Sequence, residues 1–147
     1  MNAKKRRSKK QSVANSKQPK PFVLYLDRNL GKYVIATALR SAGHPVEIHD
    51  DHLPIDAPDE DWIRLCKKEG WVAVTKDKNI RFRAAEIAAV IEHDVSVFVV
   101  RAKNATGPEI ADLLVHSHSR LSNLADRTPA PFIAGIDRSG RITKYKI

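Results

Sequence analysis

The chain has 147 residues, of which 42% are hydrophobic, and it carries a formal net charge of +9. This length and composition predict one compact domain with an ordinary core, and the lack of any run of about 18 apolar residues excludes a membrane-spanning helix. The one cysteine, Cys66, cannot form an internal disulfide, and no secretory signal is recognised, so we expect a cytoplasmic protein in which Cys66 is a small apolar filler.

Much of the positive charge lies in residues 1–20, which hold eight Lys or Arg, no acidic residue and few apolar ones. This composition predicts a disordered basic tail. The tail is either a solubilising leader or a non-specific anchor for phosphate backbones, and the cluster "KKRRSKK" favours the anchor. The body that follows is acidic in residues 21–63 and basic in residues 64–147.

Hydrophobic patterning predicts alternating strands and helices from residue 22 onward. Strand patterns occur at residues 22–26, 44–49, 71–75 and 95–100. Helical patterns occur at residues 31–43, 58–69, 81–94 and 109–125, the last behind a capping box of Thr106 and Glu109. In the third helix, Phe82, Ala85, Ala89 and Val90 share the apolar side. This order predicts an α/β fold, a three-layer α/β/α sandwich with a central parallel sheet.

The last segment, residues 128–147, is predicted to be a C-terminal β-hairpin about the turn "DRSG". We expect this extension to join an edge of the sheet or to lie across it. In the helix before it, leucines at helical spacing either pack on the sheet or form a homodimer interface, and packing on the sheet is expected. These leucines are Leu113, Leu114, Leu121 and Leu124.

Acidic residues collect where parallel strands are predicted to end. Asp27 follows the first strand, Asp77 follows the third, and the acidic stretch 50–61 places Asp59 and Glu60 at the start of a helix. Either strand-end acid alone is equally well explained as a helix cap. Together they share one edge of the sheet, where carboxylates repel each other unless a cation lies among them. Hard oxygen ligands favour Mg²⁺ or Mn²⁺.

Such an ion binds phosphate oxygens and activates water for attack on phosphorus. Basic residues flank the acids, and each either steadies a polyanion or is ordinary surface charge; they are Arg28, Lys76, Lys78, Arg81 and Arg83. Other chemistries fit less well, because GxGxxG, GxxxxGK[ST] and GxSxG are absent. Zinc on "HDDH" (49–52) or "HSH" (116–118) is disfavoured, because His116 and His118 point apart on a helix and no cysteine cluster helps.

Three short motifs, "LDRNLG", "PDEDW" and "VTKDK", stand in an order and spacing that resemble the PIN-like domains grouped with VapC-type toxins of bacterial toxin–antitoxin pairs. The resemblance covers roughly residues 22–100, and we assign residues 21–127 to a PIN-like domain. It implies metal-dependent hydrolysis of RNA phosphodiesters by activated water, and an antitoxin protein that blocks the cleft.

Position by position, Asp27 and Asp77 match the metal-binding acids of the family, and Asp59, in preference to Glu60, matches the acid that starts the intervening helix. Two positions depart from the family pattern: Asn79 stands where a further acid is common, and Arg28 stands where many relatives have a glutamate. Asn79 can still bind a metal through its amide oxygen.

Two hypotheses remain. In the first, the protein is a Mg²⁺-dependent endoribonuclease and toxin, in which the three aspartates hold the metal and the basic residues Arg28, Lys76, Arg81 and Arg83 hold RNA phosphates. In the second, it is a catalytically degenerate PIN-like module that binds nucleic acid or a protein. A phospho-receiver domain fits less well, because "LYLDRN" has only one acid after the first strand.

Overall fold

The computed structural model describes residues 21–147, so the predicted basic tail lies outside the described residues. The strands are β3 (Leu24–Leu26), β4 (Val46–Ile48), β5 (Val72–Thr75), β6 (Ser96–Arg101), β7 (Phe132–Asp137) and β8 (Ile142–Lys144). The helices are α2 (Val34–Ser41), α3 (Asp59–Glu69), α4 (Ala84–His93) and α5 (Gly107–Arg127), with short 3-10 helices at Arg28–Leu30, His49–Asp51 and Ile80–Phe82. Among the described residues, no helix is both long enough and apolar enough to cross a membrane.

The strands form one sheet in the order β4-β3-β5-β6-β7-β8, which is parallel except for β8. Its register aligns Leu26 with Val74 and Thr75 with Val99. Because parallel strands end at the same edge, this register brings the residues that follow β3, β5 and β6 together there. The predicted parallel sheet is confirmed.

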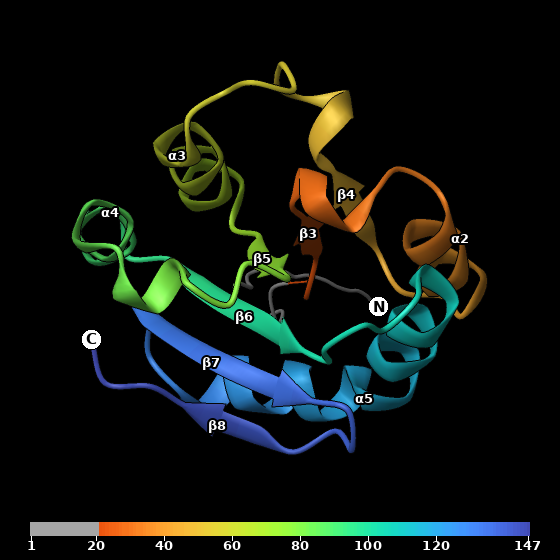
Figure 1. The fold of residues 1–147 in the computed structure, drawn as a ribbon. Helices are drawn as coiled ribbons and strands as arrows, with labels where there is room; N and C mark the ends of the chain where they lie inside the picture. The colour runs from red at the N-terminus through yellow and green to blue at the C-terminus, as the bar shows by residue number, and fades with distance from the viewer. Residues whose placement is uncertain (1–20) are drawn as a thin grey trace, which may run out of the picture.

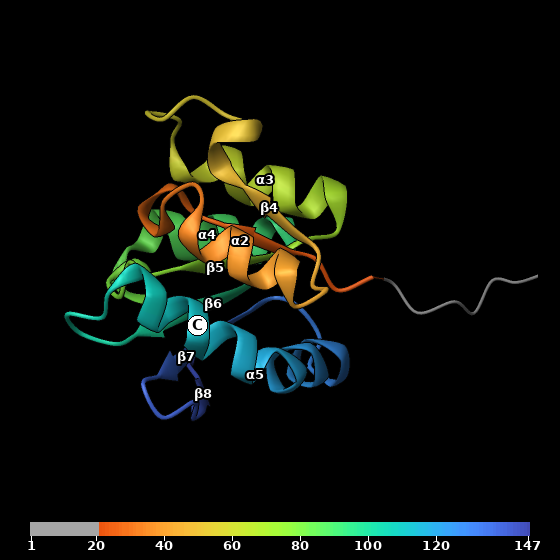
Figure 2. The ribbon, with the colours of Figure 1, turned by 90° about the vertical axis from the view of Figure 1, so that its right-hand side faces the viewer.

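Helices cover both faces of the sheet, with α2 and α5 on one side and α3 and α4 on the other (Figure 1). After a turn of 90°, α2 and α5 face the viewer and α4 lies behind the sheet (Figure 2). The alternation of side chains along β3 shows how each layer is held: Leu24 and Leu26 pack toward α2 and α5, whereas Tyr25 packs toward α3. The predicted three-layer α/β/α sandwich is therefore confirmed.

The long helix α5 packs on the sheet as expected. Leu114 and Leu121 are fully buried, and Leu113 and Leu124 are partly buried against the same core. Thr106 and Glu109 form the predicted capping box, with the Thr106 hydroxyl accepting from the Glu109 backbone N–H.

The C-terminal hairpin extends the sheet. Its first strand, β7, pairs in parallel with β6 and has buried residues along most of its length, while β8 forms the antiparallel edge. The turn is held by the Asp137 carboxylate, which accepts from the backbone N–H groups of Ser139 and Arg141. The hairpin thus joins an edge, one of the two arrangements expected.

Two details of the core differ from expectation or refine it. The helix predicted at residues 81–94 begins only at Ala84, because residues 80–82 form a 3-10 turn, and Phe82 is 67% exposed instead of packing on the apolar side. Cys66 is fully buried on the inner side of α3, and burial raises the pKa of its thiol, so it is an apolar filler as predicted.

Candidate active site

Asp27 lies at the carboxyl edge of the sheet directly after β3, and its backbone N–H continues the ladder by donating to the Val74 carbonyl at 2.9 Å. The residue is 5% exposed. One carboxylate oxygen accepts from the Arg28 backbone N–H at 2.8 Å, and the other accepts from the Thr75 hydroxyl at 2.8 Å. Burial raises the pKa of Asp27, the two hydrogen bonds oppose that shift, and the nearby charge of Asp59 adds to it.

Thr75 connects Asp27 to the loop after β5. This fully buried hydroxyl donates to Asp27 and accepts from the Asn29 side-chain amide at 3.1 Å and from the Asp77 backbone N–H at 3.1 Å. One donor and two acceptor positions exhaust the capacity of a hydroxyl. Thr75 therefore fixes Asp27 relative to the backbone that carries Asp77.

Asp59 reaches the same region from the first turn of α3. Its carboxylate accepts from the indole N–H of Trp62 at 2.9 Å, and Trp62 is almost fully buried. The Arg28 guanidinium lies 3.9 Å from Asp59 and donates to the Ala57 carbonyl at 2.7 Å. Arg28, predicted to contact phosphate, thus holds the start of α3 beside Asp27.

Asp77 forms a two-pronged ion pair with Arg83. The hydrogen bond to Asp77 raises the pKa of Arg83, and the charges of Glu86 and Asp59 act in the same direction. Arg83 is therefore surrounded by carboxylates from the β5 loop, α3 and α4.

Glu86, in the first turn of α4, was missed by the sequence-based reasoning. Its Oε1 atom is buried, lies 3.8 Å from the Arg83 guanidinium and has no hydrogen-bond partner among residues 21–147. A signal was present, because the argument that selected Asp59, an acid in the first turn of a helix that begins at this edge, applies equally to Glu86. The short 3-10 turn hid it by shifting the start of α4 to Ala84.

These carboxylates fit a divalent cation by the chemistry of their donor atoms. All are hard oxygens, Asp27 is buried with a raised pKa, and the buried Glu86 oxygen lacks a hydrogen-bond partner in the part of the chain that the structure describes. Within residues 21–147, Asp27, Asp59 and Asp77 do not form a group whose ligand atoms all lie within 4.8 Å of one another. Asp59 and Asp77 instead pair with Arg28 and Arg83, which supply the compensating charge.

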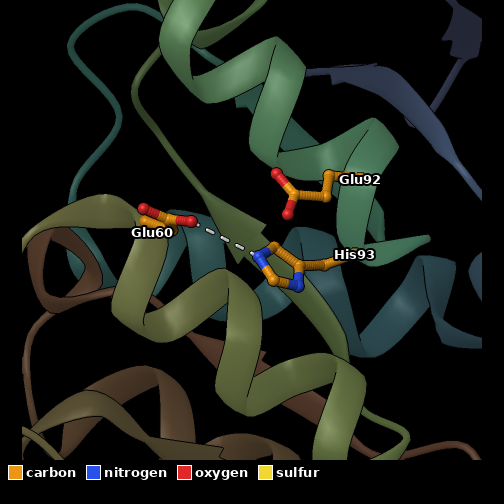
Figure 3. Close-up of side chains that lie close together, drawn as sticks. All are labelled: Glu60, Glu92 and His93. Atoms are coloured by element: carbon orange, nitrogen blue, oxygen red, sulfur yellow. Dashed lines mark hydrogen bonds and ion pairs between the residues drawn. The ribbon is translucent and has the colours of Figure 1, made fainter.

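Glu60, considered as the alternative to Asp59, points elsewhere (Figure 3). Its carboxylate lies 3.4 Å from the His93 ring and 3.3 Å from the Arg64 guanidinium. With Glu92 and His93 of α4 it forms a cluster in which one nitrogen or oxygen atom of each side chain lies within 4.8 Å of the others. Consecutive helical residues project in different directions, so only one of the pair can face Asp27, and the structure favours Asp59.

The remaining predicted residues divide between two places. Arg81 lies between the rings of Phe82 and Tyr145, with its guanidinium 4.4 and 4.2 Å from their centres, rather than extending freely toward phosphate. Lys76 and Asn79 line a cavity that also includes Asp77, and the Asn79 backbone N–H donates to the Asp77 carboxylate at 3.2 Å.

Within residues 21–147, the histidines considered for zinc do not gather into one group of ligands. His49 donates from Nε2 to the Pro54 carbonyl at 2.8 Å, so its Nδ1 accepts from the Tyr25 hydroxyl at 2.7 Å and both nitrogens are engaged. His118 is buried and stacks on His44 with 3.5 Å between ring centres, whereas His116 bonds to the Asp112 carbonyl.

Comparisons with known proteins agree with this architecture. The family model described as "PIN like domain" matches residues 22–102, more than half of the chain, and its span includes Asp27, Asp59, Asp77 and Glu86. The chain belongs to the PIN-like domain family. It is also similar to "Putative ribonuclease VapC45" of Mycobacterium tuberculosis, with 28% identity over 114 residues that cover 75% of this chain and 82% of that protein. The predicted membership of a PIN-domain, VapC-type family is confirmed.

Proposed function

We propose that this protein is a metal-dependent endoribonuclease that hydrolyses RNA phosphodiesters, and that it acts as the toxin of a toxin–antitoxin pair. The observation that carries the proposal is Asp27, a buried carboxylate with a raised pKa at the edge of the sheet, held by Thr75 beside the backbone of Asp77 and near enough to Asp59 for that charge to raise the pKa further. The similarity to a VapC ribonuclease supports the same reaction class.

Asp27, Asp59 and Asp77 would hold Mg²⁺ or Mn²⁺. Glu86 would be a fourth oxygen ligand and would replace the acid that is common in the family at the position of Asn79. A divalent cation bound there supplies a coordinated water of lowered pKa and charge to offset that of the reacting phosphate. The bonds from Arg28 N–H and from the Thr75 hydroxyl hold the Asp27 carboxylate in one orientation. Arg83, when released from Asp77, offers a planar pair of donors that suits a phosphate.

The direct test is cleavage of single-stranded RNA by the purified protein with Mg²⁺ or Mn²⁺. Asp27→Asn should abolish cleavage and leave the protein folded. Asp56→Asn is the matched control, because this aspartate is exposed in the loop before α3. RNA left intact by the parent in both metals, or equal cleavage by Asp27→Asn, would contradict the nuclease assignment.

Calorimetric titration with Mn²⁺ tests the ligand set independently of activity. Binding should be lost in Asp27→Asn and weakened about 10-fold or more in Glu86→Gln, by analogy with other changes around metal sites. Asp56→Asn should bind as the parent does, because Asp56 is exposed in the loop before α3. Equal losses in Glu86→Gln and Asp56→Asn would refute the assignment of Glu86.

The second candidate is a PIN-like module that binds RNA or a protein without cutting it. The pairing of Asp59 with Arg28 and of Asp77 with Arg83 favours this reading, because both acids are already neutralised. Absence of Mn²⁺ binding by the parent would establish it over the nuclease.

The proposed antitoxin would cover the carboxyl edge of the sheet and block Asp27. A gene for a small DNA-binding protein next to the gene for this chain would identify the candidate antitoxin. Co-expression should suppress RNA cleavage in proportion to complex formed, and a complex that cleaves RNA at the rate of the free protein would contradict this role.

A further inference from the structure

A cavity of about 630 Å³ opens beside Asp77, between the loop after β5 and the loop after β6. Its size lies within the range of about 300–1,000 Å³ that is usual for small-molecule sites. Asp77 forms part of its wall, so the cavity adjoins the candidate active site.

The floor of the cavity is apolar. Val100 and Ile110 are 4% and 3% exposed, and Ala102 and Ala105 are partly buried beside them. Asn79 and Asn104 also line the cavity. Asn104 has a φ of 62°, a left-handed conformation that bends the loop between β6 and α5 around the cavity. An apolar floor in a cavity that two asparagines also line suits a flat heteroaromatic ring with a polar edge.

Cations surround this floor. Lys76, Lys78, Arg101 and Lys103 all line the cavity and are exposed, and in residues 21–147 none of their side chains has an ion-pair partner, unlike Arg28 and Arg83. The stem of Arg101 lies across β7 at Gly135, where a Cβ would come within 2.8 Å of its Cδ. The Arg101 stem can cross β7 there because Gly135 has no side chain. Unpaired cations around a cavity attract a polyanion.

We propose that this cavity binds one unpaired nucleotide of an RNA strand, next to the phosphate that is cleaved. The base rests on Val100 and Ile110 with its polar edge toward Asn79 and Asn104, and the flanking phosphates contact the surrounding lysines and Arg101. The nucleotide is unpaired because a base in a duplex cannot leave its stack to enter a cavity without breaking its pair. The inference rests on the proposed function and adds a determinant of sequence preference to it.

Binding is measured without cleavage, by fluorescence anisotropy of labelled RNA homopolymers in EDTA, with a duplex RNA alongside. Arg101→Ala and Lys103→Ala should each weaken single-strand binding about 10-fold, and each should lower the slope of log affinity against log salt by roughly 0.7. Lys68→Ala is the matched control, because Lys68 is exposed in the last turn of α3 and carries the same charge. It should change binding little.

Base recognition is tested by Asn104→Gly, since glycine accepts the left-handed conformation and removes only the amide. The parent should bind one homopolymer several-fold more tightly than the others, and this preference should shrink in the variant. A loss of RNA binding in Lys103→Ala is not explained by misfolding, because the Lys103 side chain makes no hydrogen bond or ion pair within residues 21–147.

Three outcomes would refute nucleotide binding in the cavity. Lys103→Ala could bind RNA as tightly as the parent, Lys68→Ala could lose as much RNA affinity as Lys103→Ala, or duplex RNA could bind as tightly as single strands. These are separable from failure of the proposed function. If the parent never cleaves RNA but Lys103→Ala weakens RNA binding, nucleotide binding in the cavity is supported and the nuclease assignment is refuted. If cleavage depends on Asp27 but Lys103→Ala does not change RNA binding, the nuclease assignment is supported and nucleotide binding in the cavity is refuted.

Discussion

Thr75→Val tests whether the Thr75 hydroxyl holds the candidate site together. Valine has nearly the shape of threonine but neither donates nor accepts, so the change leaves the 5% exposed Asp27 carboxylate without its side-chain donor. It also removes the acceptor for the Asn29 amide and the Asp77 N–H. A hydrogen bond to a charged group contributes about 1.5–3 kcal/mol, so the free energy of unfolding should fall by about 2 kcal/mol near neutral pH.

The pH dependence of this loss has a definite sign. The Thr75 hydrogen bond lowers the pKa of Asp27 and so opposes the effect of burial. Its removal raises the folded-state pKa further, and the cost is complete where Asp27 is ionised in both proteins. As the pH falls through the folded-state pKa of Asp27, the carboxyl group becomes neutral and the difference between parent and variant should shrink.

Urea unfolding of the parent, Thr75→Val and Thr75→Ser at neutral and acid pH measures this difference. The expected loss corresponds to a fall in Tm of roughly 8 °C for Thr75→Val at neutral pH. Thr75→Ser keeps the hydroxyl and loses one buried methyl group, so it should cost about 1 kcal/mol at every pH. A Thr75→Val variant as stable as the parent, or one whose deficit does not change with pH, would refute the role given to the hydroxyl.

Three further predictions concern the scaffold. Gly135→Ala should cost about 1–3 kcal/mol in urea unfolding, because the new methyl group overlaps the Tyr145 hydroxyl and the Arg101 stem; an unchanged midpoint would contradict this packing. Burial, together with His44, lowers the pKa of His118 to about 4, so stability should fall as the pH drops below about 6.5 toward that value. In thermal melts, His118→Phe should lose part of this acid sensitivity, and an identical pH profile would exclude His118 as its source. Gly70→Ala should cost about 1 kcal/mol in urea unfolding through strain alone, since Gly70 ends α3 at a φ of 76° and an added Cβ would meet no atom within 4 Å; a loss well above this would show a hidden contact.

Local periodicity was sufficient to predict the order of strands and helices. The runs around Tyr25 and Ala73 are apolar throughout because both faces of a parallel sheet are covered. Local signals also mark helix ends, because α3 ends at Gly70 and α5 begins at its capping residue Thr106. Parallel strands end at one edge, so the order of the elements is sufficient to predict that Asp27 and Asp77 lie at the same edge.

The sequence was a poorer guide to which acidic side chains face the candidate site. Asp59 and Glu60 are adjacent and both acidic, and only the packing of α3 against α4 directs Glu60 to His93 and leaves Asp59 beside Arg28. Glu86 was overlooked because the start of α4 depends on a 3-10 turn that periodicity does not resolve.

The sequence by itself thus determined the layers, the parallel sheet and the two strand-end aspartates, since these depend on periods of two and 3.6 residues and on the direction of the strands. The tertiary structure alone decided that Arg28 and Arg83 neutralise the acids, that Arg81 lies between two rings, and that four cations surround an apolar cavity beside Asp77. Such pairings join loops and helices far apart in the chain, and their geometry is set by how those elements pack.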